Sequence, residues 1–210
     1  ENLCFKGIFE KLRTNSALIG VFMKYTIVPN KEVRIAISGK SGCGNTTVST
    51  LLSETLGISM INYTFRSLSA EIGLSLAEIL EKAKTDDSFD ITVDTRQVEM
   101  AKESSCVLGS RLAIWMLKEA DLKVYLLADD ETRANRVFIR EGGNLQEIMD
   151  FTAMRDREDS IRYQKLYKID NNDFDFVDMQ INTALYNPQQ IVEQILEKLV
   201  SMKKKKKSEN

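Results

Sequence analysis

The sequence contains no histidine in its 210 residues. Without an imidazole group the chain cannot carry out Ser-His-Asp hydrolysis or Cys-His proteolysis, and it offers no histidine ligand for zinc. Cysteine is scarce as well. The sequence has three cysteines, an odd number, and they lie far apart at Cys4, Cys43 and Cys106. A disulfide framework is therefore not expected, and the cysteine content favours a reducing compartment, which we take to be the cytoplasm.

Long apolar stretches and an excess of one charge are also missing. Ala17–Phe22 is followed closely by Lys24 and falls short of the roughly 18 residues of a membrane span. Without Lys203–Lys207, 24 basic and 31 acidic residues remain, a net charge of −7. A general nucleic-acid-binding surface is therefore not expected outside that lysine run. With 43% hydrophobic residues the chain can still bury the core of one domain.

Both ends of the chain are expected to lie outside the fold. Glu1–Gly7 (ENLCFKG) resembles the scar left by protease removal of an expression tag, with Met23 as the natural start. A native leader helix over residues 1–22 is the alternative. We expect a single domain over 23–202 and a basic disordered tail over 203–210, with no membrane or nucleic-acid partner.

Short apolar runs alternate with helical periods along the chain, which predicts an α/β fold. Strands that alternate with helices indicate a parallel sheet, here of about five strands, covered on both faces. The predicted strands lie near residues 33–38, 58–62, 105–108, 122–128 and 176–181, and the predicted helices near 46–56, 65–72, 76–84, 92–102, 111–118, 131–141, 145–168 and from 188 onward.

A glycine-rich segment follows the first predicted strand and opens a helix. Its spacing, G-x-x-x-x-G-x-T, is that of a phosphate-binding loop, with Asn45 in the place of the usual lysine. The glycines let successive N–H groups converge on one anion, and the helix N-terminus adds positive charge. Thr46 is placed to ligate Mg²⁺ on the phosphates, and Lys40 could supply the charge missing at Asn45. A plain strand-to-helix turn is the alternative, but it needs one glycine and not three. The predicted ATP-binding residues are Gly39, Lys40, Ser41, Gly42, Cys43, Gly44, Asn45, Thr46 and Thr47.

Arg155, Asp159 and Arg162 share one face of a predicted helix, since they are spaced i, i+4 and i+7. Two guanidiniums around a carboxylate can grip phosphoryl oxygens while the carboxylate fixes them. We therefore predict that these three residues and Lys40 are catalytic. Solvated helices joined by salt bridges are the alternative interpretation.

Arg133, Arg136 and Arg140 repeat this pattern on the preceding helix, and Arg136 is predicted to contact ATP. Gly142-Gly143 lies between the two helices and could act as a hinge. Phosphoryl transfer needs a cover that excludes water, because ATP would otherwise be hydrolysed. The sequence therefore predicts an arginine-rich lid over residues 140–166.

Arg66 follows the second predicted strand, and Ser110 and Arg111 follow the third. Residues just past the carboxyl ends of parallel strands face the ligand crevice of the sheet. We expect these residues to hold the phosphate of a second nucleotide and Asp94 to contact its base or sugar, within an acceptor-binding insert over 63–103. Ordinary surface arginines are the alternative.

Several segments together resemble the cytidylate kinases, specifically the archaeal-type branch of the nucleoside monophosphate kinases. The resemblance covers about 34–199 and implies a three-layer P-loop kinase fold with an acceptor-binding helical insert and a helical lid. It also implies transfer of the ATP γ-phosphate to CMP or dCMP with Mg²⁺, in pyrimidine nucleotide metabolism. We expect a monomer. The segments that carry the resemblance are 37–49 (ISGKSGCGNTTVS), 65–79, 120–142, 155–170 and 177–196.

Two further positions depart from the pattern of this family, besides Asn45. Tyr63 stands where an aspartate is expected, and Gly109 where a carboxylate would orient Mg²⁺ through water. These departures leave open a nucleotide-binding regulatory module with little or no turnover. Lys40 leaves open a dimerising ATPase that hydrolyses ATP without an acceptor.

Overall fold

The computed structural model describes residues 32–208, with side chains as far as 202. The expected segment 1–22 lies outside the described residues. Glu32–Val192 forms one compact unit, and the residues from Glu193 onward belong to a second. The sheet and the cavity described below lie within the first unit.

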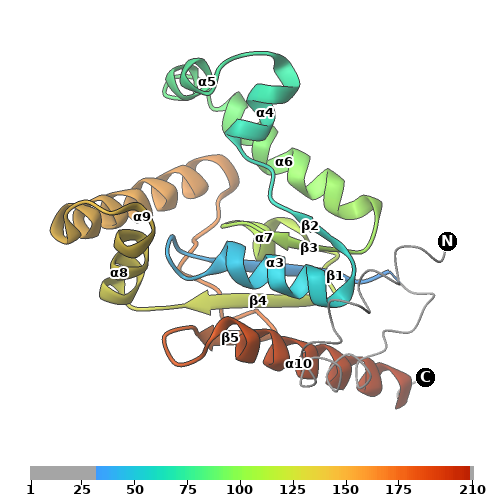
Figure 1. Ribbon diagram of the computed structural model, residues 1–210. Helices are drawn as coiled ribbons and strands as arrows, with labels where there is room; N and C mark the ends of the chain where they lie inside the picture. The colour runs from blue at the N-terminus through green and yellow to red at the C-terminus, as the bar shows by residue number, and fades with distance from the viewer. Residues whose placement is uncertain (1–31, 209–210) are drawn as a thin grey trace, which may run out of the picture. The chain divides into compact units, whose positions relative to one another are not determined.

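A five-stranded parallel sheet with the order β2-β3-β1-β4-β5 forms the centre of the first unit, as predicted. Ile35 of β1 lies opposite Val107 of β3 and Leu122 of β4. Because all the strands are parallel, their carboxyl ends meet at one edge (Figure 1). The strands are β1 Arg34–Gly39, β2 Ser59–Ile61, β3 Cys106–Gly109, β4 Leu122–Leu127 and β5 Met179–Asn182.

Helices connect these strands and cover the sheet. Ala36, Leu108 and Tyr125 belong to one buried cluster with residues of α6 and α7, and α3 lies on the opposite face (Figure 1). The helices are α3 Asn45–Leu56, α4 Phe65–Ile72, α5 Leu76–Lys82, α6 Ser88–Glu103, α7 Ala113–Met116, α8 Asp130–Glu141, α9 Leu145–Tyr167 and α10 Pro188–Ser208.

The fifth strand begins later than predicted. Phe174 stacks on Tyr125 with ring centroids 3.9 Å apart, and Val177 N–H donates to the Phe174 carbonyl in a turn. The aromatic residues before β5 therefore pack on the sheet instead of extending it. The last helix is longer than predicted: α10 continues to Ser208, so the lysine run lies in a helix where a disordered tail was expected.

Helices α4, α5 and α6 lie together beyond β2 (Figure 1). Tyr63, Leu68 and Ile79 form a small buried cluster among them. Thr64 and Ser75 cap α4 and α5 through capping boxes, which fix where these short helices begin. This group covers the residues for which an acceptor-binding insert is predicted.

Helices α8 and α9 follow β4 and are joined by a tight turn. Gly142 and Gly143 have φ of 72° and 101°, a conformation that glycine adopts without strain, and Asn144 caps α9 through its side chain. In the described part of the chain, no helix is long and apolar enough to cross a membrane.

Candidate active site

A cavity of about 690 Å³ lies at the carboxyl edge of the sheet. All nine predicted loop residues, Gly39–Thr47, line it. Its other walls come from α6, from the residues after β3, from α8 and α9, and from the segment after β5. The sheet thus brings the predicted phosphate loop together with arginines that are distant in sequence.

The loop has a conformation that its glycines require. Gly42 has φ of 84°, and a Cβ there would lie 2.7 Å from the carbonyl oxygen of Arg133. Gly44 has φ of 90° and precedes the first residue of α3, Asn45. The N-terminus of α3 therefore opens into the cavity, as an anion-binding helix N-terminus requires.

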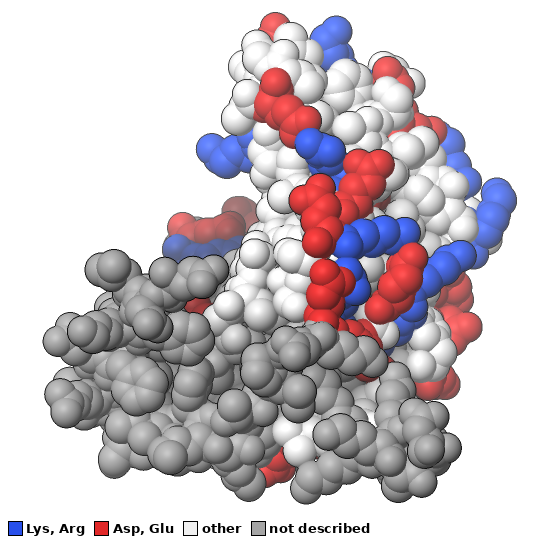
Figure 2. Space-filling model, turned by 90° about the vertical axis from the view of Figure 1, so that its right-hand side faces the viewer, with Lys and Arg blue, Asp and Glu red and all other residues white. Residues whose placement is uncertain are grey.

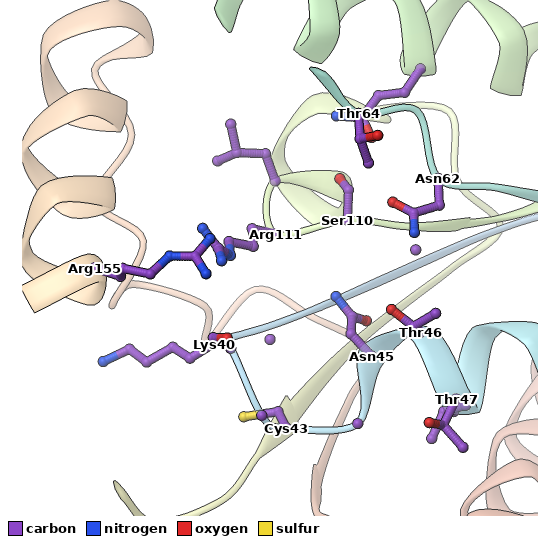
Figure 3. Close-up of a pocket in the computed structure, with 18 of the residues that line it drawn as sticks. Lys40, Cys43, Asn45, Thr46, Thr47, Asn62, Thr64, Ser110, Arg111 and Arg155 are labelled. Atoms are coloured by element: carbon purple, nitrogen blue, oxygen red, sulfur yellow. The ribbon is translucent and has the colours of Figure 1, made fainter. Parts of the chain in front are cut away.

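Asn45 and Thr46 lie on the side of the cavity that faces Asn62 and Ser110 (Figure 3). Asn45 Oδ1 and Ser110 Oγ are buried and have no hydrogen-bond partner among the described residues. Lys40 lines the cavity, but its side chain extends away from Asn45 (Figure 3). In this conformation Lys40 does not occupy the position left by the missing loop lysine.

Arg155 and Arg111 point toward each other across the mouth of the loop (Figure 3). Arg111 Nη1 donates to Asp159 Oδ2 at 2.5 Å, whereas no carboxylate of the described residues pairs with Arg155. Burial and the positive charge of Arg111 lower the pKa of Arg155. Two guanidiniums so close together favour a ligand with several negative oxygens between them.

Arg162 also lines the cavity, but acidic side chains hold it. Its guanidinium pairs with Asp90 of α6 and donates to Asp159 Oδ1 at 3.3 Å. Burial opposes its charge, yet the facing carboxylates and the Tyr163 hydroxyl outweigh that effect and raise the pKa of Arg162. Asp159 thus joins Arg111 to Arg162, a bridge that helical spacing alone did not indicate.

Asp94 and Gln97 lie on the α6 wall of the cavity. Asp94 Oδ2 accepts a hydrogen bond from the Tyr167 hydroxyl at 2.8 Å, and Oδ1 lies 3.4 Å from Gln97 Nε2. Burial raises the pKa of Asp94 to about 6. Gln97 is 3% exposed, and its Oε1 has no partner among the described residues.

Arg136 lines the cavity, but its hydrogen bonds go to protein atoms. It donates to the carbonyl oxygen of Gly42 at 3.2 Å, to Thr183 Oγ1 at 2.8 Å and to the Thr183 carbonyl oxygen at 2.7 Å. Its position at the cavity agrees with the predicted contact to ATP, but its main partners are the loop and Thr183.

The structure does not bring Arg66 to this cavity. Its side chain is exposed on α4, while Phe65 beside it lines the wall. Its predicted contact with an acceptor phosphate is therefore not supported by this conformation. Sequence reasoning missed Asp90, Gln97 and Thr183. Asp90 and Gln97 lie one turn of α6 before and after Asp94, so helical spacing was a usable signal for both. No local signal marks Thr183.

Gly109 has no room for the expected carboxylate. A Cβ at this position would lie 2.5 Å from Ser49 Oγ and 2.8 Å from Ser49 Cβ. The serine therefore fills the space that a longer side chain at position 109 would need. The absence of a carboxylate at position 109 is therefore accompanied by a neighbour, Ser49, that fills its space.

The fold and the cavity define a class. A phosphate loop at the end of the central strand, faced by arginines from two helices, is the arrangement of a P-loop kinase. Solved structures share this fold, among them shikimate kinase from Bacteroides thetaiotaomicron, with a TM-score of 0.57 at 17% identity over 80% of this chain and 98% of that one. Deoxyadenosine kinase from M. mycoides aligns with a TM-score of 0.50 at 18% identity, over 80% of this chain and 99% of that one.

Sequence similarity narrows the class to a family. Residues 34–185 match the model of the cytidylate kinase-like family. The chain is 40% identical to cytidylate kinase 2 of Borreliella burgdorferi over 180 residues, which are 84% of this chain and 100% of that one. It is 39% identical to the cytidylate kinase of Pyrococcus horikoshii over 164 residues, 77% of this chain and 85% of that one. The protein belongs to the cytidylate kinase-like family, which confirms the resemblance drawn from its motifs.

Proposed function

We propose that this protein transfers the γ-phosphate of ATP to CMP or dCMP, giving CDP or dCDP. The observation that carries the proposal is the single cavity in which the phosphate loop faces Arg111 and Arg155, two close guanidiniums. The relatives named above are cytidylate kinases, which supports CMP as the acceptor. Pyrimidine nucleotide metabolism in the cytoplasm, by a monomer, follows as part of this proposal.

The chain's own groups divide the work of phosphoryl transfer. The loop N–H groups and the start of α3 bind the phosphates of ATP. Arg155 and Arg162 neutralise charge on the transferring phosphoryl, and Arg111 aims the acceptor phosphate at it. Asp159 orients Arg111 and Arg162 through the hydrogen bonds described above. Such a transfer needs positioning and charge neutralisation and little covalent chemistry from the protein.

Mg²⁺ is the metal that this reaction implies, and the oxygens at the site suit it. The Thr46 hydroxyl lines the cavity, and Asn45 Oδ1 and Ser110 Oγ are buried without partners in the described residues. Hard oxygen ligands are those that Mg²⁺ prefers, and it usually keeps several waters and substrate phosphates. Thr46 would hold the ion together with the nucleotide, and the ion would neutralise phosphate charge.

The α6 wall offers a way to recognise the acceptor base. With Asp94 ionised, both Asp94 and Gln97 Oε1 present acceptor oxygens to the cavity. Cytosine carries an amino donor at C4, where uracil carries a carbonyl acceptor. A wall of buried acceptor oxygens therefore favours cytosine, because uracil would leave Gln97 Oε1 without a partner.

The fold leaves less support for an ATPase that works without an acceptor. The acceptor side of the cavity is walled by α6 and lies beside the phosphate loop, a space that an ATPase without an acceptor would not need. Among the residues not drawn in grey in Figure 2, acidic and basic side chains are intermingled, so this part of the face offers no continuous basic surface to a nucleic acid. A regulatory module would bind both nucleotides without turnover.

A panel of nucleoside monophosphates tests the proposal. The protein is incubated with ATP, Mg²⁺ and CMP, dCMP, UMP, AMP or GMP, and the diphosphate products are quantified. CMP or dCMP should exceed AMP and GMP by at least about 10-fold in kcat/KM, a discrimination that a few base contacts supply. If AMP were the best acceptor, the assignment of the substrate would fail. Binding without any product would instead indicate the regulatory module.

A further inference from the structure

Three successive carbonyl groups of the phosphate loop are each held from outside the loop. Arg133 Nη1 donates to the Ser41 oxygen at 3.0 Å, and Arg136 Nη1 to the Gly42 oxygen at 3.2 Å. Thr183 Oγ1 lies 3.0 Å from the Cys43 oxygen and 3.1 Å from the Leu127 oxygen, and its one proton is shared between these two acceptors. We call Arg133, Arg136 and Thr183, with these three bonds, the carbonyl clamp. Its members lie on α8 and just after β5, between 92 and 140 residues from their partners.

The clamp determines which way the loop's peptide groups face. A peptide whose carbonyl is tied outward must direct its N–H to the other side, because the group is planar. Cys43 N–H closes the turn on the Lys40 carbonyl. The N–H groups of Gly42, Gly44 and Asn45 have no acceptor within the described residues. They remain available to an anion in the cavity, as a nest of backbone donors requires.

Arg133 is the most buried member of the clamp, with 1% of its surface exposed. Its Nη2 also donates to Asp130 Oδ1 at 2.6 Å and to Asp156 Oδ2 at 2.7 Å. Two carboxylates therefore offset the positive charge that Arg133 brings beneath the loop. The effect of Arg133 on the loop is then mainly geometric. Asp156 lies on α9, so the same guanidinium joins the loop to the helix that carries Arg155 and Arg162.

Arg133 also fits closely against the loop through its backbone. The backbone of Arg133 occupies the space beside Gly42, where a Cβ would come within 2.9 Å of its Cα. The loop and the first turns of α8 thus fit each other at both the backbone and the guanidinium. A clamp of this kind could fix the anion site at a loop that lacks the lysine expected at Asn45.

We infer that Arg133 and Thr183 are positioning residues for ATP: they hold the loop carbonyls outward so that its N–H groups face the phosphates. This inference rests on the proposed function in taking ATP as the ligand of the loop. It predicts that weakening the clamp reduces the affinity for ATP and leaves the affinity for CMP unchanged. A merely structural role would lower the melting temperature without separating the two nucleotides.

The chain offers a matched control arginine. Arg34, at the amino end of β1 and away from the loop, donates Nε to the Ala101 carbonyl at 3.0 Å and Nη2 to the Lys102 carbonyl at 2.8 Å, and it pairs with Glu32. Arg133→Lys and Arg34→Lys both keep the positive charge and lose the planar fork that serves several acceptors at once. Only the first change affects the clamp.

Isothermal titration of the full chain with MgATP, and separately with CMP, tests the inference. Arg133→Lys should raise the Kd for ATP about 10-fold, the effect of one or two lost hydrogen bonds, with the Kd for CMP within about 2-fold of wild type. Arg34→Lys should leave both constants unchanged. Unchanged ATP affinity in Arg133→Lys, or equal losses in the two variants, would overturn the inference.

Thr183→Val provides a second variant if Arg133→Lys does not fold. It has nearly the same shape and removes the hydroxyl that serves the Cys43 carbonyl, so the Kd for ATP should rise several-fold. An unchanged Kd would contradict the clamp. Because the measurement is binding, it is independent of turnover: a wild type that binds ATP but does not phosphorylate CMP would refute the proposed function alone.

Discussion

The two halves of the cavity are built differently. On the ATP side, the loop carbonyls are hydrogen-bonded to α8 and Thr183, and glycines fit closely against neighbouring backbone. On the acceptor side, Gln97 Oε1 and Ser110 Oγ are buried without partners in the described residues, and Arg66 lies outside the cavity. The loop backbone on the ATP side is therefore held in place before its nucleotide binds, although Asn45 Oδ1 there also has no partner in the described residues. The acceptor half has two such groups, which a ligand would satisfy.

The largest expected effect comes from disrupting the phosphate loop on the ATP side of the cavity. Gly42→Ala places a Cβ 2.7 Å from the Arg133 carbonyl oxygen at a φ of 84°. Hydrogen bonds to a charged group contribute about 1.5–3 kcal/mol each, so losing one or two of those between the loop and the phosphates should raise the Kd for ATP about 100-fold. Titration with MgATP measures it.

Gly57→Ala is the matched control for that substitution. Gly57 also has positive φ, 65°, but nothing lies within 4 Å of a Cβ there. It should lose about 1 kcal/mol of stability and keep its ATP affinity. If both variants bound ATP like wild type, the loop backbone would not be held in place before ATP binds.

The next largest effect, on kcat, is expected from the arginines that lie between the ATP side and the acceptor side of the cavity. Arg155→Ala and Arg162→Ala should each lower kcat about 100-fold, because their contacts tighten in the transition state. Arg157→Ala, an exposed arginine of the same helix, should change kcat little. Steady-state kinetics with ATP and CMP decide the matter. Near-normal turnover in both active-site variants would show that this face of α9 is only a solvated surface with salt bridges and has no part in catalysis.

A smaller effect is expected from the base-reading wall. Asp94→Asn can present an amide N–H to the uracil carbonyl, so the ratio of kcat/KM for CMP to that for UMP should fall about 10-fold. Asp87→Asn is the control, because Asp87 is the N-cap residue of the same helix and pairs with Lys165 outside the cavity lining. An unchanged ratio in Asp94→Asn would show that the base is recognised elsewhere.

The same carboxylate predicts a pH dependence. The pKa of Asp94 is raised to about 6, so the side chain is ionised above that pH and protonated below it. Only the ionised form offers both oxygens as acceptors, so KM for CMP should rise as the pH falls from 7.5 to 5.5. KM measured across that range should show the rise in wild type and lose it in Asp94→Asn.

The smallest effects concern the missing lysine. Asn45→Lys should leave kcat flat or reduced, because Arg111, Arg155 and Arg162 already provide charge and tighter ground-state binding does not help turnover. Lys40→Ala should cost about 10-fold in kcat, the scale of one partly solvated phosphate contact. A large gain from Asn45→Lys with no effect of Lys40→Ala would indicate a decayed kinase.

The features that depend on the local spacing of residues could be predicted from the sequence. The parallel sheet, the loop of Gly39–Thr47 and the arginine face of α9 follow from periodicity and glycine pattern, and the motifs identified the family. Contacts between distant segments carry no local signal. The bonds from Arg133 to Ser41, from Thr183 to Cys43 and from Asp90 to Arg162 join residues 72 to 140 positions apart. Arg136 was expected at ATP, and its binding to the loop backbone could not be read from the sequence.

Transfer of labelled phosphate tests the central claim most directly. The wild-type protein is incubated with Mg²⁺ and ATP labelled at the γ-phosphate, with and without CMP, and the labelled products are separated. We predict that the label appears in CDP when CMP is present, and that little inorganic phosphate forms in that reaction, because the arginine-bearing helices and the acceptor exclude attacking water. Label released as inorganic phosphate at the same rate with and without CMP would contradict the account.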